Sequence, residues 1–153
     1  MVGNVAYLRF IHSLQTLSFA NYGGIPLKGE YCHESALRLV LHTLSTSAAR
    51  YGRFITPLLS LSIDFYVRIF VRVQTSQLQV KNVFSKTAMY YVCTGCQAWF
   101  EEPLGKVQEK VHEGSGNVNY VYRTMAGPSF KDGRCPHCGS TTHVSGHLVQ
   151  SRV

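Results

Sequence analysis

The chain has 153 residues, of which 45% are hydrophobic, and it carries 15 lysines and arginines against 8 aspartates and glutamates. This composition excludes a disordered tail and suffices for the core of one domain, or of one domain with a small metal-stapled lobe. The net charge of +7 favours a polyanionic partner such as RNA, because phosphate contacts release counterions; a basic surface that only aids solubility is the alternative.

The positive charge is concentrated in the first part of the chain. Residues 1–92 hold 9 basic and 3 acidic side chains, a net +6, and residues 93–153 hold 6 and 5, a net +1. The longest apolar run is interrupted by Asp64, Arg68 and Arg72. Each of these charges would cost about 2.5 to 3.5 kcal/mol at the centre of a bilayer, so we expect no membrane segment.

The first third of the chain is predicted to contain an amino-terminal segment, a loop and a helix. Residues 1–20 have apolar side chains at three- and four-residue steps, which fits an amphipathic helix or a loose extension. The glycine-rich stretch NYGGIPLKGEY must turn, and we expect its backbone to approach something closely, without a partner being specified. A helix is predicted from Glu30 until Gly52, with an apolar face formed by Ala36, Leu37, Val40, Leu41, Leu44 and Ala48. Glu34 in its first turn suits the helix dipole, which accounts for it better than a functional pair with His33.

Residues 65–73 alternate in polarity and predict a strand. The face formed by Phe65 and the residues at steps of two after it is wholly apolar and must meet a core. The other face presents Arg68 and Arg72 on either side of Phe70. Cations beside an aromatic ring can hold phosphates and stack on a base, whereas pairing with neighbouring carboxylates is the alternative.

Four cysteines form two C-x-x-C pairs, Cys93 with Cys96 and Cys135 with Cys138. Four thiolates spaced in this way can close a tetrahedral, structural site around one Zn²⁺, with Zn–S bonds of about 2.3 Å. Redox dithiols and disulfides are the alternatives. The glycines and the proline around the pairs indicate turns, however, and not the helix start of a thioredoxin-like motif.

The remaining cysteine and several histidines have simpler interpretations. His137, His143 and His147 are near enough in sequence to replace one sulfur, although they are better explained as surface histidines. Cys32 has no partner and is expected to be a buried, reduced thiol. Cysteines spaced as metal knuckles favour a reducing intracellular compartment: nucleus, cytoplasm or mitochondrion. The first 29 residues lack acidic side chains, but their single arginine is too weak a signal for a targeting segment.

Strands at 89–92 and 98–100 are expected to bracket the first cysteine pair, and residues 105–134 to form a polar excursion with a short strand at 119–125. The sequence contains no G-x-G-x-x-G, P-loop, G-x-S-x-G or H-E-x-x-H motif, and its few acids form no general acid–base pair. The residues alone therefore predict a zinc-stapled basic domain that binds RNA.

Four segments, YGGIPLKGEYCHESALRLVLHTL, YGRFITPLLSLSIDFYVRIFVRV, CTGC and CPHCGSTTHVSG, occur in this order. Together they resemble the tRNA (guanine-26-N(2))-dimethyltransferases over about residues 21–146. The resemblance implies an α+β chain: the end of a Rossmann-like methyltransferase domain, followed by a mixed α/β C-terminal domain with a four-cysteine zinc-knuckle lobe. The family's S-adenosylmethionine site and D-P-[FY]-G catalytic loop precede the matching stretch, so we expect little activity from this chain alone, as a partial gene product or a short paralogue.

The same resemblance implies a division of the chain. Residues 1–20 would be a non-matching segment whose periodicity fits a helix; residues 21–53 a methyltransferase remnant of loop plus helix; residues 54–146 the tRNA-binding domain with the zinc site; and residues 147–153 a non-matching tail.

The activity implied is S-adenosylmethionine-dependent methylation of guanosine in tRNA, with this part mainly binding tRNA and neither DNA nor a membrane. A non-catalytic, zinc-dependent RNA-binding module is the alternative. Lys28, Arg53, Arg68 and Arg72 are then the expected phosphate contacts, and Tyr22 would lie near the active site.

Overall fold

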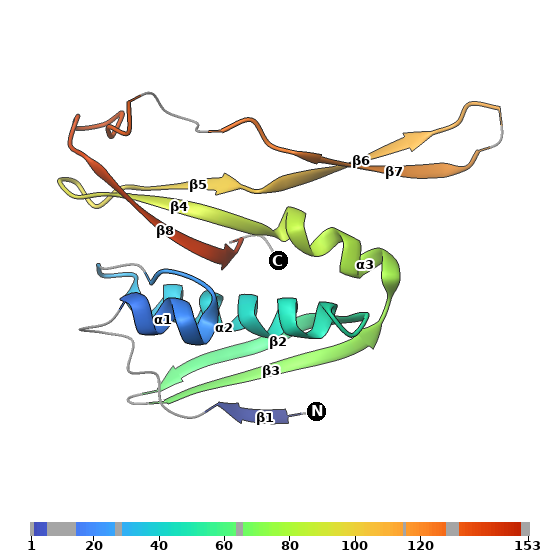
Figure 1. Cartoon of the computed structure of the whole chain (residues 1–153), viewed down its shortest axis with the longest axis horizontal. Coiled ribbons are helices and arrows are strands. Elements are labelled where there is room, and N and C mark those ends of the chain that lie inside the picture. Colours follow the sequence, from blue (N-terminus) through green and yellow to red (C-terminus); the bar gives the residue numbers. More distant parts are fainter. Residues whose placement is uncertain are drawn as a thin grey trace.

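The computed structural model describes residues 2–5, 15–26, 29–63, 66–114, 116–127 and 132–150. Two three-stranded antiparallel sheets lie on opposite sides of one long helix, and a two-stranded ribbon extends away from the second sheet (Figure 1). The elements in chain order are β1 (Val2–Val5), α1 (Gln15–Tyr22), α2 (Cys32–Ala49), β2 (Arg53–Ile63), β3 (Tyr66–Thr75), α3 (Gln77–Lys81), the 3₁₀ helix η1 (Asn82–Lys86), β4 (Thr87–Cys93), β5 (Trp99–Pro103), β6 (Gly105–Val111), β7 (Val118–Thr124) and β8 (Thr142–Val149).

Helix α2 confirms the helix predicted from the three- and four-residue periodicity. Glu34 stands in its first turn and accepts from Arg38 one turn later, with 2.6 Å between the guanidinium Nη2 and the carboxylate Oε1. The helix ends where Gly52 adopts a φ of +67° and donates its N–H to the carbonyl of Ala49. No described helix is long and apolar enough to cross a membrane.

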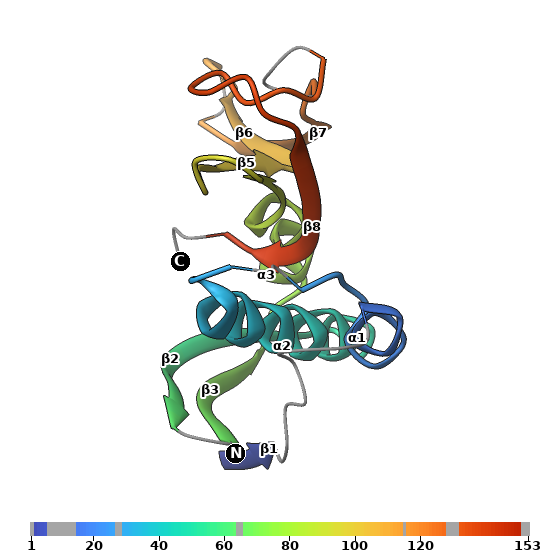
Figure 2. The ribbon, with the colours of Figure 1, turned by 90° about the vertical axis from the view of Figure 1, so that its left-hand side faces the viewer.

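The first sheet has the strand order β1-β3-β2 and packs its inner face on α2. Val67 and Ile69 of β3 are buried against Leu37, Val40 and Leu41 of the helix, as the alternating pattern predicted. The outer face carries Arg68, Phe70 and Arg72, and no described element covers it (Figure 2).

The second sheet, of order β5-β4-β8, packs on the other side of the same helix. Leu39 is completely buried there, among Ala88, Tyr90 and Val92 of β4 and Leu148 of β8. Figures 1 and 2 both show α2 between the two sheets. The helix is therefore apolar on two sides, and it joins two cores that have no direct strand pairing.

The glycine-rich stretch after α1 docks on β8. Ile25 and Gly146 exchange both backbone hydrogen bonds, at 2.6 and 3.1 Å, and the Ser145 hydroxyl donates to the Ile25 carbonyl at 2.7 Å. A Cβ on Gly24 would lie 2.5 Å from Leu39 Cδ1 and 2.8 Å from the Gly146 carbonyl oxygen. The expectation of a close approach is confirmed, and its physical reason is contact with the core.

The amino-terminal segment differs from the predicted helix. Val2–Val5 is a strand that pairs antiparallel with β3, and the helix α1 begins only at Gln15. The helical prediction is therefore wrong for Val2–Val5; residues 6–14 lie outside the described ranges. The reason is that β3 has an edge with unpaired N–H and C=O groups, and a periodicity count cannot detect that pairing opportunity.

Besides β1, three strands were not predicted from the sequence: β2, β6 and β8. The strand β2 contains Pro57, which argues against a strand, yet the register with β3 shifts between Pro57 and Leu59, so the proline falls at an irregularity of the ladder. The expected polar excursion contains the predicted strand as β7, paired along its length with the unpredicted β6. The proposed division after residue 53 falls one residue into β2, a strand that packs against α2.

Replacing Leu39 by alanine should strongly destabilise the fold. The side chain is fully buried, so Leu39→Ala is expected to lower the free energy of unfolding by about 2 to 5 kcal/mol. Leu58→Ala is the matched control, because that side chain is 57% exposed and its loss should cost less than about 0.5 kcal/mol. Urea denaturation followed by circular dichroism measures both, and equal losses would contradict the assignment of the core.

The buried side of α2 also predicts a pH dependence of stability. The rings of His42 and His147 of β8 stack with centroids 5.7 Å apart. Burial, and then the charge of His147, lower the pKa of His42 below its usual value. The unfolded chain then binds the proton more readily, so stability should fall as the pH drops through the unfolded value of about 6.5.

His42→Phe should therefore lose less unfolding free energy than the unsubstituted protein between about pH 7.5 and about pH 5.5. His33→Phe, a change at a histidine in the first turn of the same helix, should leave that loss unchanged. Denaturant unfolding of zinc-loaded protein at both pH values provides the measurement. An identical pH dependence in the His42 and His33 variants would rule out His42 as its source.

Candidate metal centre

The two cysteine pairs sit in two loops of the same construction. The first follows β4 and the second precedes β8. In each, the backbone N–H of the first cysteine donates to a carbonyl five residues later: Cys93 to Ala98 and Cys135 to Ser140, both at 2.8 Å. The residue after the second cysteine has a positive φ in both loops, +60° at Gln97 and +74° at Gly139. The expected turns are thus present, and they direct both cysteines of each pair to one side.

The loops approach each other so closely that a side chain at Gly95 would displace the neighbouring loop's side chains. A Cβ on Gly95 would lie 2.5 Å from Ser140 Oγ and 3.3 Å from Cys138 Sγ. The N–H of Thr94 donates to the Thr141 carbonyl at 3.1 Å, which fastens the first loop to the start of β8. The glycine in the first C-x-x-C pair therefore allows the close contact between the loops.

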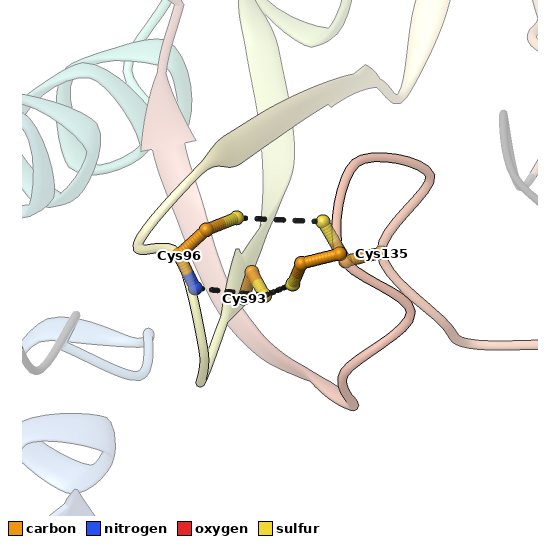
Figure 3. Close-up of side chains that lie close together, drawn as sticks. Cys93, Cys96 and Cys135 are labelled. Atoms are coloured by element: carbon orange, nitrogen blue, oxygen red, sulfur yellow. Dashed lines mark hydrogen bonds between the residues drawn. The ribbon is translucent and has the colours of Figure 1, made fainter.

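All four sulfurs of the pairs lie within 4.8 Å of one another (Figure 3). The shortest separations cross between the loops, with 3.3 Å from Cys93 Sγ to Cys138 Sγ and 3.7 Å from Cys96 Sγ to Cys135 Sγ. Four sulfurs about 2.3 Å from a central tetrahedral Zn²⁺ would be about 3.8 Å apart. The four cysteines could therefore hold a metal ion, and their number, chemistry and spacing fit zinc.

The same distances weigh against the alternatives. A disulfide needs its sulfurs about 2.05 Å apart, and all of these thiols are free. A C-x-x-C redox dithiol would pair its own two sulfurs, whereas short sulfur contacts here also link the two loops. Two of the cysteines are buried and two are exposed, so the site lies at the surface with one side covered.

The protonation of the thiols indicates what a cation would add. Hydrogen bonds from the Ser140 hydroxyl, its backbone N–H and the Cys93 thiol lower the pKa of Cys138 to about 6. The N–H of Ala98 favours the Cys96 thiolate, but burial and the thiols of Cys138, Cys93 and Cys135 outweigh it and raise the pKa of Cys96 to about 12. A divalent cation would favour ionisation of all four ligands, and its binding would release protons.

The histidines considered as substitute ligands and the fifth cysteine, Cys32, are not members of this group. His137 stacks on Phe100 with ring centroids 5.7 Å apart, and His147 stacks on His42. Among the described residues, the four paired cysteines are the group that could hold a metal ion. Cys32 is a free, half-buried thiol at the start of α2.

Two of the predicted RNA-contact residues lie together on the first sheet. Arg68 and Arg72 are exposed on the outer face of β3, with half-buried Phe70 between them. Their cross-strand neighbours on β2 are Leu61 and Thr56, and within the described ranges no carboxylate pairs with either guanidinium. The alternative of a structural ion pair therefore finds no partner in that part of the chain.

The other three predicted contacts are placed differently. Arg53 lies opposite Thr75, donates to its hydroxyl at 2.6 Å, and belongs to the opposite face of the sheet from Arg68 and Arg72. Tyr22 is half-buried and packs against both cores, so packing accounts for its ring. Lys28 lies outside the described residues.

Comparison with known proteins identifies relatives of most of the chain. A family model described as N2,N2-dimethylguanosine tRNA methyltransferase matches residues 13–152, which includes residues 13–20 and 147–152 beyond the resemblance seen in the sequence. The chain is 46% identical over 132 residues to the mitochondrial tRNA (guanine(26)-N(2))-dimethyltransferase of Saccharomyces cerevisiae, and 43% identical over 130 residues to the enzyme of Schizosaccharomyces pombe. Each alignment covers 85% of this chain and 23% of the relative.

A solved structure is similar as well. Trm1 from Pyrococcus horikoshii in complex with S-adenosyl-L-methionine matches with a TM-score of 0.55 and 25% sequence identity, over 57% of this chain and 24% of that one. The chain thus spans about a quarter of the length of the relatives it matches.

The metal centre predicts a defined stoichiometry. Native mass spectrometry should find about one zinc ion per chain, because four thiolates complete a tetrahedral site. Cys96→Ser should lose the ion, whereas Cys32→Ser, which removes a thiol outside the group, should retain it. Zinc-free native protein in which all four paired thiols are freely alkylated would contradict the site.

Proposed function

We propose a function in tRNA modification for this chain because it belongs to the N2,N2-dimethylguanosine tRNA methyltransferase family. Its part in that function is to bind and position tRNA. The enzyme as a whole is proposed to dimethylate guanosine at position 26 of tRNA, as the names of the relatives state for those proteins. The observation that carries the proposal is the family match over residues 13–152.

The charges of the described residues support a role in tRNA binding. The chain has a net charge of +7, and Arg68 and Arg72 are exposed on a sheet face that no described element covers. Guanidinium groups on either side of a ring can contact phosphates while the ring packs against a sugar or base. Because phosphate contacts carry no sequence information, this face would orient tRNA without selecting a particular sequence.

The metal centre supports the same function indirectly. A structural zinc ion would hold the end of β4 to the start of β8, and β8 packs on the helix that carries the arginine-bearing sheet. In the proposed reaction S-adenosylmethionine supplies the methyl group that is transferred to the exocyclic amine of guanine. The residues of this chain contribute by holding the tRNA in one orientation, which places that amine for in-line transfer.

A non-catalytic, zinc-dependent RNA-binding module is the second candidate for the chain by itself. One observation favours it: within the described ranges, the carboxylate that reaches a pocket beside α2, Glu34, is paired with Arg38 and is not poised as a free base. Incubation of the chain with tRNA and S-adenosylmethionine carrying a labelled methyl group distinguishes the two candidate functions. Methyl incorporation would exclude the second candidate; tRNA binding without incorporation would favour it.

Arg72→Ala should weaken tRNA binding uniformly across different tRNAs. Loss of one phosphate contact should reduce the slope of log Kobs against log salt concentration by about one. Filter binding over a range of salt concentrations measures both effects. Lys110→Ala is the matched control, because it removes the same charge from the exposed ribbon strand β6, away from β3 (Figure 1). An unchanged slope for Arg72→Ala would exclude this contact, and equal changes in both variants would indicate only a general charge effect.

A further inference from the structure

A pocket of about 130 Å³ lies between the start of α2 and the sheet that carries the metal centre. Its base is formed by two buried side chains, Tyr90 of β4 and Leu148 of β8. Its rim includes two aromatic side chains that remain exposed, Tyr31 at 38% and Trp99 at 45%. Exposed aromatic rings over an apolar base are the usual platform for an unstacked nucleobase.

The ring of Trp99 at the rim packs against the ring of Tyr90 at the base of the pocket. The rings of Trp99 and Tyr90 are 5.8 Å apart between centroids and tilted by 45°, which is a favourable aromatic arrangement. One face of the tryptophan is thereby supported by protein, while nearly half of the side chain remains open to solvent. A flat ligand could stack on it without first ordering the side chain.

The polar wall of the pocket includes the carboxylate of Glu34. Both contacts of Arg38 with Glu34, at 2.8 and 2.6 Å, use the same carboxylate oxygen, Oε1. Arg38 is further held by its bond to the Val149 carbonyl at 3.0 Å. Among the described residues no hydrogen bond or ion pair engages Glu34 Oε2. An ionised carboxylate can only accept hydrogen bonds, so this oxygen suits an amino group on the edge of a base.

A hydrogen bond connects the rim of the pocket to the loop that contains Cys93 and Cys96. The Tyr31 hydroxyl donates to the carbonyl of Gln97 at 3.3 Å, and Gln97 directly follows the ligand Cys96. Trp99 stands two residues further along, at the start of β5. The conformation of one short loop therefore determines the positions of both rim aromatics.

We propose that this pocket binds one unpaired nucleobase of RNA, stacked on Trp99 beside Tyr31, with an amino group of the base donating to Glu34. The inference rests on the proposed tRNA-binding function and adds a site to it. A base inside a duplex cannot present its face to the pocket, so the occupant is a base from a loop, a bulge or a single strand. The chain's net charge of +7 favours RNA over an apolar peptide.

Trp99 is the single tryptophan of the chain, so its fluorescence reports on this pocket alone. The zinc-loaded 153-residue chain is titrated with the RNA tetranucleotides CCCC and UUUU. We expect saturable quenching by CCCC, and a midpoint at least about threefold higher for UUUU, because uracil has no amino group for Glu34. Quenching of equal midpoint by both would overturn the role of Glu34, and absence of saturable quenching would overturn the pocket.

Two tyrosine variants provide the matched test. Tyr31→Ala removes a rim ring and should raise the CCCC midpoint about fivefold or more, whereas Tyr31→Phe, which keeps the ring, should stay within about twofold of the unsubstituted chain. Tyr51→Ala, at a residue 83% exposed just beyond the other end of α2, should change nothing. Native mass spectrometry verifies that each variant retains zinc. Equal effects of Tyr31→Ala and Tyr51→Ala would overturn the proposal.

The outcome is separable from that of the proposed function. If Arg72→Ala still reduces the salt slope of tRNA binding while CCCC fails to quench Trp99, the pocket is excluded and tRNA binding stands. If the chain neither binds tRNA nor shows quenching, both proposals fail.

Discussion

The convergence of four cysteine sulfurs is the constraint on which much of the architecture depends. It brings together loops that are 39 residues apart in sequence, as measured between Cys96 and Cys135. Four thiols at such short range resist full ionisation, as the raised pKa of Cys96 shows, unless a cation lies among them. The first loop ends β4 and the second begins just before β8, so a metal ion there would set the pairing of the two strands that bury Leu39. A local coordination event would thus determine the geometry of a hydrophobic core.

Helix α2 packs against both sheets and so connects the sheet that contains Cys93 to the first sheet. Leu39 faces the second sheet, of order β5-β4-β8, while Val40 and its neighbours face Val67 and Ile69 of the first sheet. The two sheets do not pair, so their relative orientation depends on how tightly both faces of one helix are packed. The proposed phosphate-binding arginines stand on the far face of the first sheet, and the proposed nucleobase pocket lies against the second. Both would be held by the same helix, which suits a ligand as large and rigid as folded tRNA.

The family relationship and the geometry bear on different questions. Membership in the N2,N2-dimethylguanosine tRNA methyltransferase family rests on identity along the chain, whereas the metal centre rests on distances between atoms. Because the chain spans about a quarter of its relatives, the activity of the whole enzyme and the part of this chain in binding RNA are proposals. The ion pair of Glu34 with Arg38 orders the start of α2 and lines a pocket; it does not form an acid–base pair.

The sequence by itself determined the features that depend on near neighbours: the helix at Cys32–Ala49 from its periodicity, the strand β3 from its alternation, and a group of four cysteines that could hold a metal ion from two C-x-x-C pairs. It could not determine which strand edge Val2–Val5 would join, how Pro57 is accommodated in a strand, or that Arg53 and Arg72 would lie on opposite faces of one sheet. Those outcomes depend on register and on partner atoms far along the chain. The pocket at Trp99 exists only because Tyr31, Glu34 and Leu148, which are distant from it in sequence, close around it. Local sequence patterns therefore predict helices, strands and candidate metal ligands. Tertiary packing decides which surfaces those elements form together.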